Sequence, residues 1–351
     1  PSTLDEALAV MDEHGFNAKL LAGGQSLIPT MNFRLAQPSL LVELNNVEAL
    51  NKLHPDESRG VRIGAMVRHS QVEHSQVVRE LAPLLHKVMP HIAHPQIRNR
   101  GTIGGSLAHA DPASELPVVM VALQAGFKLR SLGGERWVNA RDFFEALFTT
   151  TIEPEEILVA VAVPPKLPKT GYAFLELARR HGDYAQAGAA AVVTLDDRGA
   201  IHEVHLVYLN AGEIPMVAQQ AAAMLTGEVP AQDLFSEAAH FASENEIEPT
   251  ADIHDSAEFK RHLAFILGKR ADARDRAAAD VEIETGAFVV AIDVPFARPV
   301  LEYQAQKLET FARREGGGIW AVIGGAVPNH AAGQEHPGVR FLPGHLDVGI
   351  A

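Results

Sequence analysis

Two glycine-rich turns constrain the fold of this chain more than any other feature of its 351 residues. Residues 20–29 read LLAGGQSLIP and residues 101–112 read GTIGGSLAHADP, so each turn sets a Gly-Gly pair beside polar side chains. Glycine lets a backbone take a positive φ and approach a ligand or another backbone closely. The two turns therefore predict either one anion site shared between exposed backbone amides or two ordinary tight turns.

The residues around the turns narrow the kind of anion site. Neither turn has the spacing G-x-G-x-x-G or G-x-x-x-x-G-K-[ST], which disfavours a Rossmann nicotinamide site and a P-loop. Gln25 and Ser26 add hydrogen-bonding side chains to the first turn, and Thr102 and Ser106 add them to the second. Two amide nests that face each other suit a diphosphate without a lysine.

Charge and cysteine content exclude several classes of protein. The chain carries 44 acidic against 30 basic residues, a net charge of −14, which disfavours binding to nucleic acid and to anionic membranes. It has no cysteine, which excludes disulfides, thiolate catalysis and a cysteine-ligated iron–sulfur cluster. No apolar run is long enough to span a membrane and no export signal is visible, so we expect a cytoplasmic protein.

The periodicity of apolar residues predicts an α+β chain. Residues 4–14 predict a capped helix, and residues 71–89 predict a helical stretch. Residues 189–209 alternate like two antiparallel strands, and residues 214–279 are alanine-rich and helical. We therefore expect a domain that contains both glycine turns and, after it, a smaller domain of antiparallel strands and helices.

Four longer strings, in this order along the chain, resemble one known family. They are LLAGGQSLIPTMNFRLAQPSLLVELN, HPQIRNRGTIGGSLAHADPASELP, EPEEIL and ARRHGDYA, which begin at residues 20, 94, 153 and 178. They make residues 1–277 similar to the FAD-binding medium subunit of molybdenum hydroxylases, of the carbon monoxide dehydrogenase and xanthine dehydrogenase type.

The resemblance implies a domain organisation. It implies a two-part FAD-binding domain of the p-cresol methylhydroxylase/vanillyl-alcohol oxidase type over residues 1–167, with a break near residues 50–55. A flavoprotein C-terminal domain is implied over residues 168–279. Residues 280–351 then form an extra tail without a family counterpart.

The resemblance also implies which residues hold FAD. In the family, the diphosphate lies between the two glycine turns, and an acidic residue after the second turn contacts the cofactor. The isoalloxazine ring lies near the segment before the second turn, near the leucine of EPEEIL and near the aromatic residue of the GDY string. The matching positions are Ala22, Gly23, Gly24, Gln25, Ser26, Leu27 and Ile28 (first glycine turn), Thr102, Ile103, Gly104, Gly105 and Ser106 (second glycine turn), Glu115 (acid), and Ile92, Ala93, Leu158 and Tyr184 (ring).

The implied function is electron transfer in a heteromeric molybdenum hydroxylase. A large subunit would hold molybdopterin and a small subunit the [2Fe–2S] clusters, assembled as a dimer of heterotrimers. Electrons would pass from the clusters to the FAD of this chain and on to an external acceptor, a role that fits a chain without cysteine. We expect no catalytic residue and no metal ligand here. Two alternatives stay open: a self-contained FAD oxidase or reductase, and a non-catalytic assembly subunit that has lost FAD.

Glu176 departs from the family pattern. It stands eight residues before Tyr184, where family members carry a lysine, which puts a cation inherited from the family at this position in doubt. His91 and His94 have the spacing of metal ligands but no converging carboxylates, so we expect both to be structural or solvated.

The tail contains a faint internal echo. FVVAIDVP at residues 288–295 resembles ILVAVAVP at residues 157–164, and each string is followed by an Arg-Arg pair. The tail is either a partial repeat of residues 157–192 or an unrelated strand–loop–strand segment.

Overall fold

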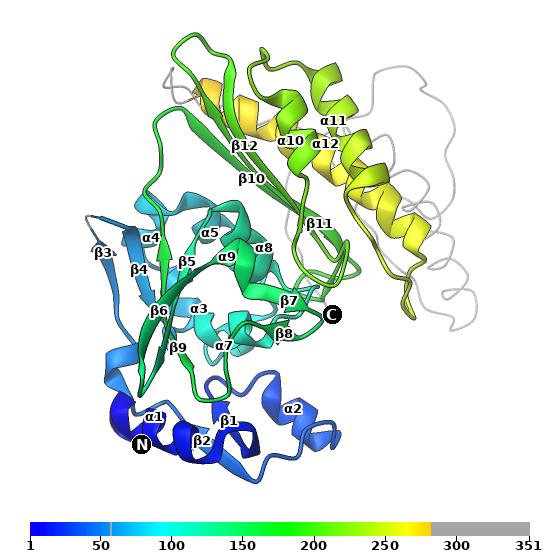
Figure 1. Cartoon of the computed structure of the whole chain (residues 1–351). Helices are drawn as coiled ribbons and strands as arrows, with labels where there is room; N and C mark the ends of the chain where they lie inside the picture. The colour runs from blue at the N-terminus through cyan, green and yellow to red at the C-terminus, as the bar shows by residue number, and fades with distance from the viewer. Residues whose placement is uncertain (57, 282–351) are drawn as a thin grey trace, which may run out of the picture. The chain divides into compact units, whose positions relative to one another are not determined.

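The computed structural model describes residues 1–56 and 58–281 (Figure 1). The segment 282–351, which holds the predicted partial repeat, lies outside the described residues. Helices and strands are mixed, as the sequence predicts. The strands of the described residues form one five-stranded sheet, one four-stranded sheet and two two-stranded sheets.

The N-terminal residues form a small α/β unit around two parallel strands. Thr3 caps the first helix, as predicted, because its Oγ1 accepts a hydrogen bond from the backbone N–H of Glu6 at 3.2 Å. The buried side of this helix packs in one apolar cluster with both strands. The elements are α1 (Leu4–His14), β1 (Ala18–Leu21), α2 (Leu27–Asn32) and β2 (Leu40–Glu43), with 3-10 helices at Gly15–Asn17 and Glu48–Leu50.

A five-stranded antiparallel sheet follows, with the strand order β3-β4-β9-β5-β6. Its central strand β9 reads ILVAVAV, and every residue of it is buried, which explains the continuous apolar run. The strands are β3 (Leu53–Asp56), β4 (Gly60–Gly64), β5 (Gly126–Ser131), β6 (Gly134–Asn139) and β9 (Ile157–Val163). Between β6 and β9 lie α9 (Ala140–Phe143), β7 (Phe144–Ala146) and β8 (Thr149–Thr150).

A run of short helices connects β4 to β5 and carries the second glycine turn. The helical stretch predicted over residues 71–89 is confirmed, and it is divided into short helices because Ser75 caps one helix and Pro83 begins another. Proline lacks the N–H that a continuing helix needs, and its ring clashes with the preceding turn. The elements are α3 (His69–Glu73), α4 (Gln76–Leu81), α5 (Pro83–Val88), the 3-10 helix η3 (Met89–His91), α6 (Pro95–Arg98), α7 (Ile103–His109) and α8 (Glu115–Ala122).

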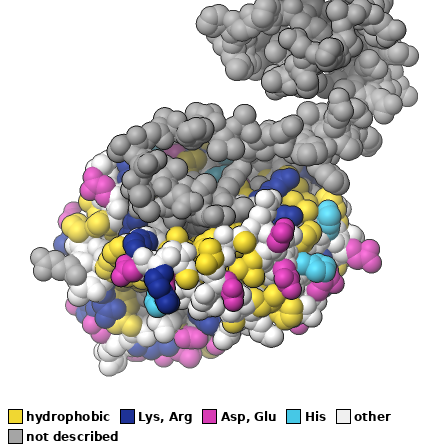
Figure 2. Space-filling model, turned by 90° about the horizontal axis from the view of Figure 1, so that it is seen from above, with side chains coloured by type: hydrophobic (Ala, Val, Ile, Leu, Met, Phe, Trp, Pro, Cys, Tyr) yellow, Lys and Arg dark blue, Asp and Glu magenta, His cyan; other side chains and the backbone are white. Residues whose placement is uncertain are grey.

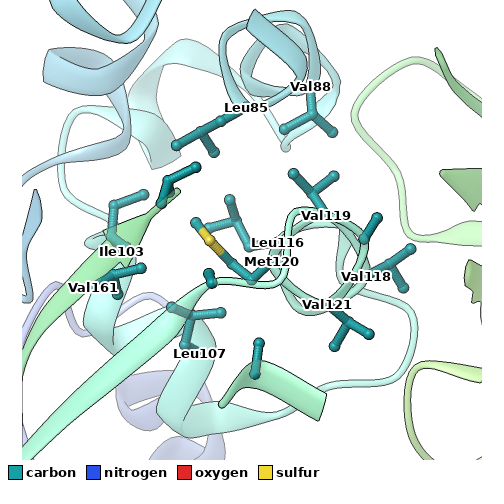
Figure 3. Close-up of a cluster of buried hydrophobic side chains, with 14 of the residues drawn as sticks. Leu85, Val88, Ile103, Leu107, Leu116, Val118, Val119, Met120, Val121 and Val161 are labelled. Carbon is teal, nitrogen blue, oxygen red and sulfur yellow. The ribbon is translucent and has the colours of Figure 1, made fainter. Parts of the chain in front are cut away.

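Helix α8 is buried on all sides, from Glu115 to Ala122. A helix that is apolar all round belongs in a core rather than on a surface. Figure 3 shows α8 surrounded by side chains of α5, α7 and β9, namely Leu85, Val88, Ile103, Leu107 and Val161. This packing fixes the second glycine turn, which forms the N-cap and first turn of α7, relative to the start of α8.

The C-terminal part of the described chain is a four-stranded antiparallel sheet between helices. The antiparallel pair predicted over residues 189–209 is confirmed as β11 and β12. Helices α10, α11 and α12 lie on one side of the sheet (Figure 1), while α5 and α8 contact the other side. The elements are β10 (Thr170–Ala178), β11 (Ala185–Leu195), β12 (Ile201–Leu209), β13 (Met216–Val217), α10 (Gln219–Leu225), α11 (Gln232–Asn245) and α12 (Ala257–Val281).

The surface of the described residues carries both signs of charge. On the face seen in Figure 2, acidic and basic side chains are interspersed among hydrophobic ones. Among the described helices, none has the length and apolar character needed to cross a bilayer.

Candidate functional site

The two glycine turns lie in direct contact, although about eighty residues separate them in the sequence. A Cβ atom added to Gly23 would overlap the carbonyl oxygen of Arg100 and would lie 2.9 Å from Cα of Gly101. A Cβ added to Gly105 would lie 3.5 Å from Cβ of Ala22. The glycines therefore allow the backbones of the two turns to touch.

The first glycine turn presents unused backbone donors. Within residues 1–56 and 58–281, the N–H groups of Gly24, Gln25 and Ser26 have no hydrogen-bond acceptor. Gly24 has a φ of 72°, a value that favours glycine and that turns consecutive amides toward one side. These residues are half-buried, and free backbone amides of this kind are chemically suited to an anionic group without a basic side chain.

The second glycine turn is held by a buried histidine that sequence reasoning missed. The ring Nε2 of His69 lies 3.0 Å from the carbonyl oxygen of Thr102, and the backbone N–H of His69 donates to the carbonyl of Gly101 at 3.0 Å. Burial lowers the pKa of His69 to about 4, so the ring is neutral and donates through Nε2. Thr102 in turn accepts a hydrogen bond from the N–H of Gly105 at 3.0 Å.

Gly104 serves packing inside the protein. A Cβ at Gly104 would lie 2.5 Å from Cβ of Ala65, and the N–H of Gly104 donates to the Ala65 carbonyl at 2.8 Å. This N–H is therefore already used and does not face a ligand. Ser106 links the turn to the start of α8, because its Oγ lies 3.2 Å from Oγ of Ser114.

Arg98 fixes the segment that contains the predicted ring residues Ile92 and Ala93. Its Nη1 donates to the carbonyl oxygens of Ile92 and Ala93, both at 3.0 Å. Its Nε and Nη2 donate to the two carboxylate oxygens of Glu73 at 2.8 and 3.1 Å. Arg98 is buried, and sequence reasoning missed it although it lies in the string HPQIRNRG.

The GDY string lies against this segment. Gly182 has a φ of 84°, and a Cβ there would lie 2.7 Å from the carbonyl oxygen of Ala93. Tyr184 follows with 68% of its surface exposed, so its ring is free to stack on a planar ligand. Local desolvation, together with the negative charges of Asp111 and Glu115, raises the pKa of the Tyr184 phenol.

Three titratable side chains gather beside the ring segment. Glu115 is buried at the start of α8, and burial raises its pKa to about 7. His91, at the end of η3, places Nδ1 3.0 Å from Oε1 of Glu176 on β10. This hydrogen bond raises the pKa of His91 against the effect of its burial. The sequence prediction that His91 is simply structural or solvated missed this partner.

The structure thus groups the predicted residues into two neighbouring sets. The first set joins the two glycine turns, and the second joins Ala93, Glu115 and Tyr184. Leu158 belongs to neither set by direct polar contact: it is buried in the hydrophobic core on β9, a strand that packs on α7. Ile92 and Ile103 are buried in the same core.

Two family models match successive parts of the chain. Residues 1–166 match the FAD binding domain in molybdopterin dehydrogenase. Residues 172–273 match the CO dehydrogenase flavoprotein C-terminal domain.

Curated relatives match over most of their own length. The 6-hydroxypseudooxynicotine dehydrogenase complex subunit alpha of Paenarthrobacter nicotinovorans is 39% identical over 272 residues, which is 78% of this chain and 91% of the relative. Caffeine dehydrogenase subunit beta of Pseudomonas sp. (strain CBB1) is 36% identical, over 78% of this chain and 92% of the relative.

Solved structures agree with these relatives. A chain of carbon monoxide dehydrogenase from Hydrogenophaga pseudoflava superimposes with a TM-score of 0.76 at 35% identity, over 80% of this chain and 96% of that chain. A chain of quinoline 2-oxidoreductase from Pseudomonas putida 86 gives a TM-score of 0.75 at 36% identity, with the same coverage. The prediction made from the four sequence strings is confirmed: the chain belongs to the family of FAD-binding medium subunits of molybdenum hydroxylases.

Proposed function

We propose that this chain binds FAD non-covalently, with the diphosphate between the two glycine turns. The observation that carries the proposal is the contact between the turns beside three unused amides, those of Gly24, Gln25 and Ser26. In a chain with a net charge of −14, such amides provide positive electrostatic potential without a basic patch.

The isoalloxazine ring is proposed to lie beside Ala93 and Tyr184, within reach of Glu115. Support comes from the close approach of Gly182 to Ala93 and from the electrostatic influence of Glu115 on Tyr184. The proposal includes a two-part FAD-binding domain of the p-cresol methylhydroxylase/vanillyl-alcohol oxidase type over residues 1–167 and a C-terminal domain over residues 168–279.

The chain is the FAD-carrying electron-transfer subunit of a heteromeric molybdenum hydroxylase. We propose that a large subunit holds molybdopterin and a small subunit holds the [2Fe–2S] clusters, in a cytoplasmic dimer of heterotrimers. Bound FAD supplies the redox chemistry, and this chain orients it, tunes its electrostatic surroundings and limits the access of water. The chain has no cysteine, so the iron–sulfur clusters belong to partner subunits.

The diphosphate assignment is tested by flavin content in two matched glycine variants. Gly105→Ala places a methyl group between the turns, 2.8 Å from Oγ1 of Thr102, whereas Gly133→Ala meets nothing closer than Oγ of Ser131 at 3.6 Å. Gly105 is a better test position than Gly104, because a side chain at Gly104 would also clash with Ala65 and could lower FAD binding through folding alone.

We expect Gly105→Ala to bind FAD at least about tenfold more weakly, a cost of roughly 1.4 kcal/mol. Gly133→Ala should carry flavin like the wild type. The visible absorbance of the purified proteins and titration of the apoproteins give the result, with circular dichroism as the check on folding. Equal FAD affinity in a folded Gly105→Ala protein contradicts the assignment.

A further inference from the structure

A histidine–carboxylate cluster, in which both carboxylates are largely buried and the histidine is half-buried, lies on the proposed ring side of the site. It consists of His91, Glu115 and Glu176, which come from η3, α8 and β10 and are called the ring-side cluster below. Nδ1 of His91 lies 3.0 Å from Oε1 of Glu176, and the negative charge of Glu115 acts on His91 and Glu176 acts on Glu115. The imidazole also packs edge-on against Phe174, with ring centroids 5.3 Å apart.

The ring-side cluster adjoins the proposed isoalloxazine position by two routes. His91 directly precedes Ile92 and Ala93, whose carbonyls are fixed by Arg98. The ring of His181, which precedes Gly182, lies 6.1 Å from the ring of His91.

Glu176 is more than a satisfied structural partner. Its side chain is 6% exposed, and its second oxygen, Oε2, is buried and has no hydrogen-bond partner among the described residues. A buried carboxylate oxygen without a partner costs folding free energy, so Oε2 is an acceptor that a further donor in this pocket would satisfy. The structure does not favour a metal site here, because within residues 1–56 and 58–281 no group of three or more His, Asp or Glu side chains is arranged so that it could hold a metal ion.

We infer that His91 takes up a proton when the flavin bound in this pocket is reduced, and that Glu176 positions it for this task. The inference rests on the proposed function. In the neutral imidazole, Nδ1–H donates to Glu176 and Nε2 carries a free lone pair. Reduction by electrons from an external reductant adds negative charge nearby, and a new N–H bond forms at Nε2 with a proton from solvent. The imidazole is the path from solvent, since 36% of its side chain is exposed.

The charges around His91 favour this proton. Glu176 faces it from β10 and Glu115 from α8, and Glu115 adds its negative charge above its raised pKa of about 7. Asp111 adds negative charge to the surroundings of Glu115, while His181 on the loop after β10 is the second imidazole nearby. A negative charge close to an imidazole raises its pKa, so reduction moves the His91 pKa further upward.

The test measures the midpoint potential of FAD on the full chain as a function of pH, between about pH 6 and 9. Each extra proton taken up on reduction changes the equilibrium constant for reduction tenfold per pH unit, which shifts the midpoint potential of a two-electron couple by about 30 mV per pH unit. We expect the wild type to show this steeper slope over part of the range. The double variant His91→Gln/Glu176→Gln, which replaces the pair by neutral amides, should lose this extra slope. The single variant Glu176→Gln should lose it over the upper part of the pH range.

The matched control is Glu203→Gln. Glu203 also pairs with a histidine, since its Oε1 lies 3.2 Å from Nε2 of His205. In the sheet, Glu176 lies in register with Gly188 and Leu209. Glu203 is six residues from Leu209 along β12, which places it about 20 Å away. This variant should keep the wild-type slope. A second measurement, nitrogen NMR of His91 in oxidised and reduced protein, should show its pKa rise on reduction.

The outcomes separate two failures. Wild-type chain that binds no FAD contradicts the proposed function itself. The proton uptake is contradicted if the wild type and the double variant both bind FAD, their midpoint potentials change equally with pH, and the pKa of His91 does not change on reduction. The pair would then serve only to link η3 to β10.

Discussion

The two sides of the site are built by different means. The proposed diphosphate side is built from two short continuous segments: the first presents the free N–H groups of Gly24, Gln25 and Ser26, and the second packs against it around Gly105. The ring side consists of side chains that meet only in the folded chain, such as His91 with Glu176, 85 positions apart. A backbone site needs particular residues at fixed local spacing, whereas a side-chain site needs only a shared location.

Each side also holds one histidine, and the two histidines favour opposite protonation states. His69, on the diphosphate side, is buried beside carbonyl oxygens, and burial lowers its pKa to about 4. His91, on the ring side, has Glu176 as a partner, and that hydrogen bond raises its pKa. Burial alone favours a neutral imidazole, and a carboxylate partner reverses this preference.

The largest effect is expected for Arg98→Met on the ring side. The variant leaves the Glu73 carboxylate and the carbonyls of Ile92 and Ala93 without their donors, which should cost about 3–5 kcal/mol of unfolding free energy. Urea unfolding measures this. Arg136→Met is the matched control, since Arg136 pairs with Glu156 at 2.7 and 2.8 Å but is 44% exposed in its side chain. Equal losses in both variants would contradict the buried role of Arg98.

The pH dependence of stability should differ between the two sides. Glu115 has a folded-state pKa of about 7, above its ordinary value of 4.5, so the folded state keeps a proton that the unfolded state releases. This stability is present below about pH 4.5 and is lost as pH rises toward 7, by about 3 kcal/mol. Glu115→Gln apoprotein should therefore gain on the wild type as pH rises, measured by urea unfolding at several pH values.

The contribution of His69 to the free energy of unfolding should change with pH in the opposite direction to that of Glu115. Its folded-state pKa lies below its ordinary value of 6.5, so the unfolded state binds a proton first as pH falls. Stability contributed by neutral His69 is lost between about pH 6.5 and 4. A difference in unfolding free energy between Glu115→Gln and the wild type that stays constant from pH 5 to pH 8 would contradict the raised pKa of Glu115.

A smaller effect is expected for Thr102→Val on the diphosphate side. Valine keeps the shape but removes the acceptor for the N–H of Gly105, at a cost of about 1–2 kcal/mol. Thr170→Val, which breaks a buried hydroxyl pair with Thr194 at 2.8 Å, is the control. Thermal unfolding should show a loss in both variants, and FAD titration should show weaker binding for Thr102→Val alone.

The smallest effect on binding is expected for Tyr184→Ala. Loss of stacking should weaken FAD binding by about 0.5–1 kcal/mol, because the diphosphate contacts stay intact. The flavin absorbance spectrum or the rate of reoxidation by an acceptor should change. A folded, flavin-loaded variant with an unchanged spectrum and unchanged reoxidation would remove Tyr184 from the site.

The difference between a site built from local backbone and a site built from distant side chains explains which features could be predicted from the sequence. The glycine turns, the antiparallel pair and the family were predicted because each depends on local residue order. The helical stretch over residues 71–89 was predicted as well, but the apolar periodicity does not show that Pro83 divides it. His69 and Arg98 were missed because nothing local marks a residue whose partners are distant carbonyls and carboxylates.

The most direct test of the central claim compares two fragments of FAD. Competition titration of the apoprotein with ADP and with adenosine isolates the diphosphate, which only ADP carries. If the amides of Gly24, Gln25 and Ser26 hold that group, ADP should bind at least about 100-fold more tightly than adenosine, since charge-assisted hydrogen bonds contribute roughly 1.5–3 kcal/mol each. Gly105→Ala should shrink this ratio. Equal binding of ADP and adenosine by a wild-type protein that still binds FAD would contradict the account.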